Sequence, residues 1–223
     1  MDTIHSLVLT ASGGPFRNRS LTDLESVSVR EALAHPTWSM GPKVTIDSAT
    51  LANKGLELIE AHHLFEVPYG MIDIVVHPTS VVHGLVRFRD GAALAHVGHP
   101  DMRVPISYAL TYPERRATPV PSLDLTKPLS LEFEPPDSER FPLLSLAREA
   151  GERGGTYPCA FNAANEVAVA AFLDERIGFL EIAPLVADAL DRVDGGSGVN
   201  DLPELVEADA AARRLAEGML AAA

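Results

Sequence analysis

The pattern of apolar and polar positions divides the chain into stretches that favour strands and stretches that favour helices. Short apolar runs bounded by turn residues predict strands, and they lie at 4–10, 43–46, 71–76, 81–88 and 92–97. Longer stretches with apolar residues three and four apart predict helices, and these lie at 49–65, 101–112, 141–153, 159–175, 184–193 and 203–222. We therefore predict an α+β fold, in which a small mixed sheet is followed by a helical bundle.

Proline content suggests where these two parts are joined. Five prolines fall between residues 118 and 136, a composition typical of an extended surface connector. The chain is therefore predicted to divide into residues 1–117, a connector at 118–136 and a helical bundle at 137–223. One bundle helix carries a stripe of mostly small residues suited to close packing: Ala160, Ala163, Ala164, Val167, Ala168, Ala171 and Phe172. Its polar residues Asn162, Asn165 and Glu166 are expected on a capped, polar outer face, with a functional role as the alternative.

Composition narrows the classes of partner. A chain of 223 residues is long enough to bury a core, and its net charge of -13 argues against nucleic acid. A phosphorylated small molecule stays possible because it needs only a local site. The lone Cys159, the lack of an apolar run of about 20 residues and the lack of a signal-peptide pattern predict a soluble cytoplasmic protein without a membrane partner.

Candidate chemistry concentrates between residues 35 and 65. Asp47 and Ser48 are expected to cap the start of the helix at 49–65, because their side chains can accept from free N–H groups of a first turn. Asn53, Lys54 and Glu57 are three and four residues apart and share one face of that helix. The positive end of a helix attracts anions, phosphate above all. The alternative is an ordinary Lys–Glu pair on a solvated face.

Two loops are further candidates. Ser12 is followed by Gly13 and Gly14, and paired glycines let backbone N–H groups turn toward an anion, although a plain turn has the same composition. Trp38, the single tryptophan, lies on a loop between two prolines. Its ring could close as a lid over a ligand or could fix the loop to the core.

Several long motifs in order resemble one enzyme family over essentially the whole chain. They are SGGPFR at 12–17, HPTWSMG at 35–41, DSATLANKGLELIEA at 47–61, HPTSVVH at 77–83, GHPDMRVPI at 98–106 and FNAANEVAVAAFL at 161–173. Together they resemble the 1-deoxy-D-xylulose 5-phosphate reductoisomerases of the non-mevalonate isoprenoid pathway. Members of this family convert that ketose phosphate to 2-C-methyl-D-erythritol 4-phosphate with NADPH and a Mg²⁺ or Mn²⁺ ion, and they are commonly homodimers.

The resemblance implies a role for each candidate residue. Residues 1–117 would be the catalytic domain that binds substrate and metal. Glu57 would be a catalytic residue and a metal ligand, and His35 would lie over the substrate as the second catalytic residue. The implied substrate-binding set is Ser12, His35, Ser48, Asn53, Lys54 and Glu57. The flap over the site would carry Trp38 and Met40, and Gly41 would touch the cofactor.

Two features of the family are not found in this sequence. One is the N-terminal Rossmann-like domain that binds NADPH, and the other is an Asp-Ser-Glu stretch that supplies two further metal carboxylates and a substrate serine. We therefore expect the cofactor domain to lie on a longer natural chain or on a separate one, and this chain alone to be inactive. The strand at 4–10 is expected to have an exposed edge that packs on that domain. The alternative is a non-catalytic module for phosphosugar binding or for dimerisation.

Overall fold

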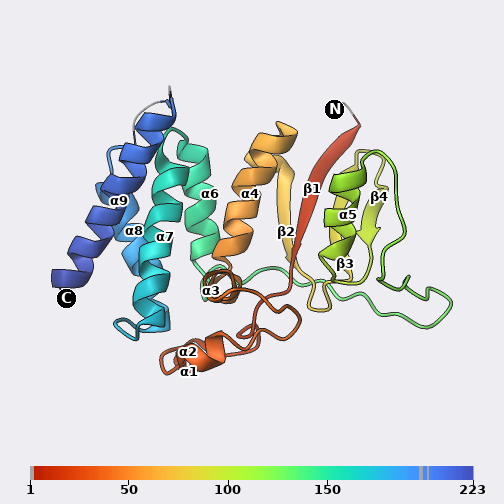
Figure 1. Ribbon diagram of the computed structural model, residues 1–223, viewed down its shortest axis with the longest axis horizontal. Coiled ribbons are helices and arrows are strands. Elements are labelled where there is room, and N and C mark those ends of the chain that lie inside the picture. The colour runs from red at the N-terminus through yellow and green to blue at the C-terminus, as the bar shows by residue number, and fades with distance from the viewer. Residues whose placement is uncertain (1–2, 196–197, 200, 223) are drawn as a thin grey trace. The chain divides into compact units, whose positions relative to one another are not determined.

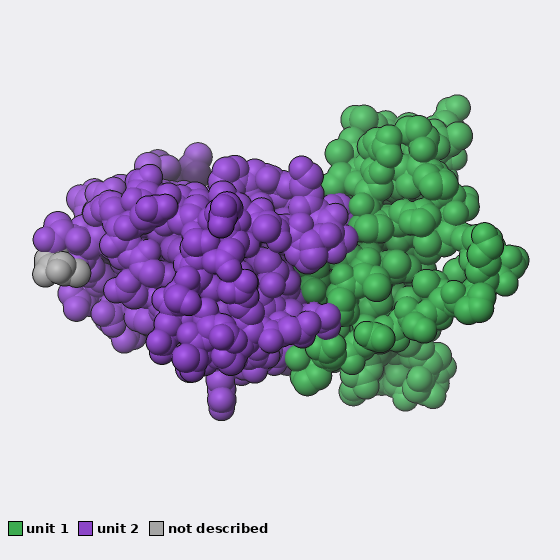
Figure 2. Space-filling model, turned by 90° about the horizontal axis from the view of Figure 1, so that it is seen from below, with its two compact units in different colours: residues 1–12, 73–135 green, residues 13–72, 136–223 purple. Residues whose placement is uncertain are grey.

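The chain folds into two compact units, each made of two separate segments (Figure 2). The computed structural model describes residues 3–195, 198–199 and 201–222, so the outermost ends of the predicted domains 1–117 and 137–223 lie outside it. Residues 1–12 and 73–135 form the first unit, here called the sheet unit, and residues 13–72 and 136–223 form the helical unit. The predicted division at 118 and 136 concerns functional domains and stays a prediction.

The sheet unit is built on a four-stranded mixed sheet in the order β2-β1-β3-β4 (Figure 1). Its strands are β1 (Ile4–Ala11), β2 (Ile72–Val76), β3 (Val82–Phe88) and β4 (Ala93–Val97). β3 is antiparallel to both β1 and β4. The His77 N–H donates to the Ala11 carbonyl oxygen at 2.7 Å, where β1 and β2 both end, so these two strands run in parallel. The predicted α+β class and mixed sheet are confirmed.

The expectation of an exposed edge on the first strand is wrong. β1 lies inside the sheet, with β2 on one side and β3 on the other, so its backbone groups have strand partners on both sides. The edge strands are instead β2 and β4, and all five residues of β4 are exposed. Helix α5 (Arg103–Thr111) follows it. Residues 113–136 contain no helix and only one bridged position, Glu134 with Val76. The connector predicted at 118–136 stays a prediction.

The helical unit surrounds α7, which packs against α3, α6, α8 and α9. Its helices are α1 (Leu21–Leu24), α2 (Val29–Ala32), α3 (Pro42–Thr50), α4 (Ala52–Phe65), α6 (Leu143–Arg153), α7 (Tyr157–Leu173), α8 (Ile182–Arg192) and α9 (Leu202–Ala222), with 3₁₀ turns η1 (Tyr69–Met71) and η2 (Phe179–Glu181). The predicted stripe of α7 is buried except for Val167, which is half-buried. Val169, which was not part of the predicted stripe, is buried as well. Among the described helices, none is both long and apolar enough to cross a membrane.

The predicted strand at 43–46 is wrong, because these residues belong to α3. Val44, Thr45 and Ile46 are β-branched and favour strands, but this preference is weak and depends on packing. Pro42 suits the first turn of a helix, and the Lys43 ammonium lies 2.6 Å from the Asp47 carboxylate one turn later. Thr45 and Ile46 are buried in the resulting helix. The predicted helix start at 47–48 is therefore wrong as well.

Helix α4 lies unusually close to α6 at Gly55. A β-carbon placed on Gly55 would lie 2.4 Å from the β-carbon of Ala147, which is fully buried on α6. That separation is far below an ordinary carbon–carbon contact of about 3.5–4 Å. The two helices can therefore be this close only with glycine at position 55.

The Gly55→Ala variant is expected to be less stable by about 1–3 kcal/mol, because the added methyl group overpacks the contact with Ala147. Urea unfolding measures this change. Gly218→Ala on α9 is the matched control, since nothing lies within 4 Å of its β-carbon position, and it should gain up to about 1 kcal/mol of helix propensity. Equal changes in both variants would contradict the close contact.

Candidate functional site

The candidate residues gather around the junction of two helices. α3 ends and α4 begins at Leu51, the cap residue of both helices, which adopts a left-handed backbone with φ of 62°. Such a conformation costs an ordinary residue about 1–2 kcal/mol, and the Leu51 side chain, which is 3% exposed, holds it in place. The turn separates Ser48, in the last turn of α3, from Asn53 in the first turn of α4. The anion-attracting helix start therefore lies at Asn53 and Lys54 rather than at Ser48.

His35 connects the loop before α3 to Ser48. Its Nδ1 accepts the backbone N–H groups of Thr37 at 3.1 Å and Trp38 at 2.9 Å. An imidazole nitrogen that accepts hydrogen bonds carries no proton, so in the neutral ring the proton lies on Nε2. Burial lowers the pKa of His35 below its ordinary value of 6.5, which favours this neutral form at pH 7. His35 thus fixes the tryptophan loop through one nitrogen and faces Ser48 with the other.

Ser48 is left with a proton that it can donate. The His35 Nε2 lies 3.1 Å from the Ser48 Oγ, and because Nε2 is the protonated nitrogen, it donates and the hydroxyl accepts. The hydroxyl hydrogen can then be directed at a further acceptor. Gly14 packs against the same turn, since a β-carbon on it would lie 2.7 Å from the Ser48 carbonyl oxygen. Gly13 and Gly14 both have positive φ, of 84° and 66°, the conformation that glycine adopts most readily.

The second group of polar residues lies on α4. The Glu57 carboxylate accepts from the Asn53 amide at 2.7 Å and is 2.5 Å from the Lys54 ammonium. The Lys54 side chain is only 12% exposed, while that of Glu57 is 38% exposed. Among the described residues, no side chain caps the start of α4. The predicted set Asn53, Lys54 and Glu57 therefore does share one face, with the cation more deeply buried than the anion.

Glu57 is the residue expected to bind a Mg²⁺ or Mn²⁺ ion. A hard divalent ion takes about six oxygen ligands, with more than one carboxylate in a typical protein site. Within the described part of the chain, no three His, Cys, Asp or Glu residues are grouped closely enough to hold a metal. Glu57 by itself does not fit a Mg²⁺ or Mn²⁺ site. The role of Glu57 as a metal ligand stays a prediction that requires carboxylates from elsewhere.

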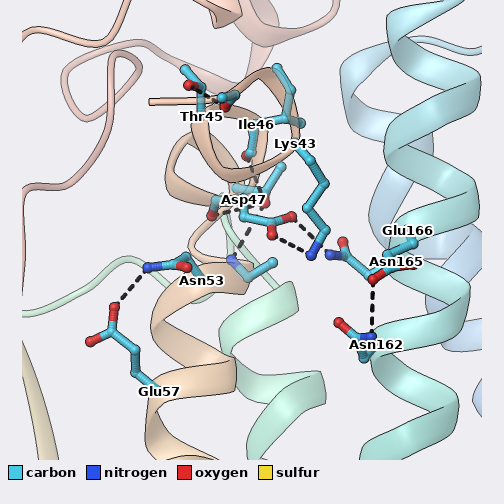
Figure 3. A network of polar contacts seen from close by, with 12 residues as sticks. Lys43, Thr45, Ile46, Asp47, Asn53, Glu57, Asn162, Asn165 and Glu166 are labelled. Carbon is cyan, nitrogen blue, oxygen red and sulfur yellow. Dashed lines mark hydrogen bonds and ion pairs between the residues drawn. The ribbon is translucent and has the colours of Figure 1, made fainter. Parts of the chain in front are cut away.

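A buried carboxylate links α3 to α7 (Figure 3). Asp47 is 1% exposed and is held by the Lys43 ammonium at 2.6 Å and by the Asn165 amide, which donates at 2.8 Å. Within the region that the structure describes, the amide oxygen of Asn165 is buried without a hydrogen-bond partner, which costs about 1–3 kcal/mol. Asn165 is fully buried, so its predicted place on an outer polar face is wrong.

The remaining predicted residues occupy a range of environments. Trp38 and Met40 are half-buried on the loop before α3. Gly41 is exposed, and nothing lies within 4 Å of its β-carbon position, so neither packing nor its φ of -65° requires glycine there. Ser12 is the last residue of the sheet unit, whereas the other predicted residues all belong to the helical unit. The cofactor role of Gly41 and the flap role of Trp38 and Met40 stay predictions.

Sequence reasoning did not identify Lys43, Asp47 and Asn165 as a connected group. The spacing of Lys43 and Asp47 is that of an ion pair on a helix, a signal that was available but conflicted with the strand prediction. Asn165 lies three residues before Ala168 and four after Phe161, on the buried face of α7. That spacing could have placed it inside the bundle.

Comparison with known proteins finds one family. The family described as "DXP reductoisomerase C-terminal domain" matches residues 97–215, and that described as "1-deoxy-D-xylulose 5-phosphate reductoisomerase C-terminal domain" matches residues 1–65. The chain is 56% identical to the 1-deoxy-D-xylulose 5-phosphate reductoisomerase of Thermomicrobium roseum over 97% of its own length and 56% of the relative's. The chain is also 55% identical to the 1-deoxy-D-xylulose 5-phosphate reductoisomerase of Heliobacterium modesticaldum, over 94% of its own length and 54% of the relative's. The chain thus spans little more than half the length of these relatives.

Solved structures agree with these matches. The reductoisomerase "from zymomonas mobilis in complex with NADPH" has a TM-score of 0.91 and 47% identity, over 98% of this chain and 56% of that one. A structure described as "DOX-P Reductoisomerase in complex with NADPH, fosmidomycin and magnesium" also has a TM-score of 0.91, with 46% identity over 98% of this chain and 55% of that one. The fold of the described residues therefore closely follows part of each solved chain.

The two functions of His35 can be separated by substitution. In His35→Asn, the amide oxygen can replace Nδ1 as the acceptor for the loop, whereas in His35→Gln the amide nitrogen can replace Nε2 as the donor to Ser48. Because Trp38 is the single tryptophan, its fluorescence reports on the loop. We expect His35→Asn to keep the emission of the parent and His35→Gln to shift it to longer wavelength.

Ser48→Ala is the control for this measurement. It removes the partner of Nε2 and leaves Nδ1 untouched, so Trp38 emission should not change. Equal emission from His35→Asn and His35→Gln would contradict the assignment of the two nitrogens.

Proposed function

The chain belongs to the 1-deoxy-D-xylulose 5-phosphate reductoisomerase family, whose C-terminal domain matches more than half of its residues, and on this basis we propose that it carries the substrate-binding part of such an enzyme. The proposed reaction is the NADPH-dependent conversion of 1-deoxy-D-xylulose 5-phosphate to 2-C-methyl-D-erythritol 4-phosphate. The observation that supports it best is the His35–Ser48 pair next to the start of α4, where Lys54 lies.

These residues suit a phosphate group. Lys54 is a compact cation in the first turn of α4, where the helix dipole also favours negative charge. Ser48 has a hydroxyl hydrogen to donate once its oxygen accepts from His35. Asn53 adds an amide for a neighbouring hydroxyl. The role of Ser12, which belongs to the sheet unit, stays a prediction. A charged hydrogen bond between Lys54 and a phosphate oxygen is worth about 1.5–3 kcal/mol.

Glu57 competes with the phosphate for Lys54. In the structure its carboxylate is already 2.5 Å from the ammonium, and it repels an incoming anion. When bound, the divalent ion of the family would stabilise negative charge on substrate oxygens, and we propose Glu57 as the one ligand that this chain contributes. The described residues do not complete such a site, so the phosphate contacts are the part of the function that the chain can perform by itself.

The cofactor function is proposed to come from outside residues 1–223. NADPH is present in solved structures of relatives of which this chain covers 55–56%. We propose that Gly41 touches the cofactor and that Trp38 and Met40 lie on the flap over the site. The chain alone should then show no substrate-dependent oxidation of NADPH with Mn²⁺, whereas a natural protein of the relatives' length should. Turnover by the chain alone would overturn this proposal, and the intact mass of the protein from its native cells shows which form exists.

A homodimer is the proposed assembly. β4 is an edge strand of the sheet and is exposed throughout, and α5, which follows it, has no buried residue. Large apolar side chains are exposed on both elements, and such surfaces commonly mark an interface. We propose that a second copy of the chain covers them. Sedimentation equilibrium of the parent and of Leu94→Lys tests this, since the variant should dissociate and a monomeric parent would contradict it.

Phosphate binding can be tested with variants that are expected to change the affinity in opposite directions. In metal-free buffer, Lys54→Ala should weaken binding of 1-deoxy-D-xylulose 5-phosphate about 10- to 100-fold, because it removes the buried cation. Ser48→Ala should weaken it about tenfold. Glu57→Gln should instead strengthen it, because it keeps the shape of the side chain and removes the competing charge. Isothermal titration calorimetry measures all three.

Lys127→Ala serves as the control. The Lys127 side chain is 78% exposed and pairs with Asp124, three residues earlier, in a part of the sequence far from the proposed phosphate-binding residues. Its affinity should equal that of the parent. Weaker binding by Glu57→Gln, or unchanged binding by Lys54→Ala, would contradict the phosphate site.

A further inference from the structure

We infer that Asn165 and Asp47 are positioning residues of the proposed phosphate site, through which α7 of the helical bundle fixes the rotation of α3 and so places Ser48 against His35. The inference rests on the proposed function for what the site binds. The geometry that supports it is independent of that function, since every contact involved lies within the helical unit.

Each carboxylate oxygen of Asp47 contacts a different side chain. One carboxylate oxygen lies 2.6 Å from the Lys43 ammonium and the other accepts from the Asn165 amide at 2.8 Å. Lys43 belongs to the same helix as Asp47, whereas Asn165 lies on α7 (Figure 3). The Asn165 contact is therefore the hydrogen bond that ties the polar face of α3 to the bundle.

Asn165 is a polar side chain on an otherwise apolar buried face of α7. The other buried residues of α7 are alanine, valine and phenylalanine, so Asn165 is the one polar residue among the buried residues described on this helix. The buried amide oxygen of Asn165 has no partner in the described region, so the side chain is incompletely satisfied and orients only toward Asp47. Directional contacts of this kind select one arrangement of two helices over neighbouring ones.

The contact between Asn165 and Asp47 also bears on the position of Ser48, the next residue of α3. Asp47 directly precedes Ser48, and both lie in the last part of α3, which ends at the strained Leu51. A rotation of α3 that breaks the Asn165 contact must also move the Ser48 hydroxyl, which lies 3.1 Å from the His35 Nε2. The distance between Ser48 and the first turn of α4 depends on the same rotation. Asn165 thus acts on the site without touching the substrate.

α7 offers a matched control. Asn162 lies one turn before Asn165 and also donates its amide to a carboxylate, that of Glu166, at 3.2 Å. Glu166 is in turn bound by Arg213 of α9 at 2.6 Å. Asn162 therefore has the same chemistry on the same helix, but it donates to a residue of α7 itself, whereas Asn165 donates to Asp47 of α3. Any effect specific to Asn165 is then an effect on α3.

The test compares Asn165→Ala with Asn162→Ala in the full-length protein that carries this chain. Because Ser48 and Lys54 are proposed to hold the phosphate and not the reacting carbons, Asn165→Ala should raise KM for the ketose phosphate about tenfold and leave kcat within about twofold. Asn162→Ala should leave both constants unchanged. Equal KM values for the two variants would overturn the inference.

A second readout does not depend on activity. In protein labelled with ¹⁵N-histidine, the ring signals of His35 should move in Asn165→Ala and stay in place in Asn162→Ala, because only the former releases Ser48. Unmoved His35 signals in Asn165→Ala would also overturn the inference. An inactive parent whose His35 signals follow this pattern would contradict the proposed function and support the positioning contact.

The single variant Asp47→Asn covers the case in which Asn165→Ala does not fold, because it removes the buried charge and keeps an amide oxygen that can accept from Asn165. Since the contact between α3 and α7 is kept and only the ion pair with Lys43 is lost, KM and the His35 signals should stay close to those of the parent. A KM raised about tenfold in this folded variant would show that the Asn165 contact does not position the site.

Discussion

Asp47 is a charged side chain inside a helical bundle, and the site depends on how that charge is accommodated. Moving a carboxylate out of water costs several kcal/mol even after the protein relaxes, so donors must be present at fixed places. Lys43 supplies one from within α3, and Asn165 supplies the other from α7. With both donors in place, α3 has one favourable orientation. Ser48 and the loop that carries His35 take their positions from it, as does the turn at Leu51.

Much of the fold could be predicted from the sequence because its signals are local. The strands β1 to β4 are short apolar runs between turn residues, and the long helices repeat apolar residues at three and four positions. The group Asn53, Lys54 and Glu57 was predictable for the same reason, since residues three and four apart on a helix must share a face. His35 and Ser48 were also identified, but through resemblance to a family. Their hydrogen bond could not be inferred from spacing.

The errors arise where packing between distant segments decides the structure. Residues 43–46 have the composition of a strand, yet Thr45 and Ile46 are buried in α3 against other helices. Asn165 is polar and was expected outside, but its partner is a carboxylate 118 residues earlier in the chain. β1 appeared to be an edge because β2 and β3, which lie on either side of it, come more than 60 residues later. In each case the deciding neighbour is remote in sequence.

The separation between Asp47 and Asn165 also has a consequence for biosynthesis. A ribosome adds about 5–20 residues per second, so Asp47 emerges roughly 6–24 s before the residue that completes its hydrogen bonds. During that interval α3 lacks its partner on α7. The Asp47 carboxylate is then more stable in water than in the interior of a partly formed bundle. The early segment of the helical unit should therefore stay open and accessible to chaperones until α7 has been made.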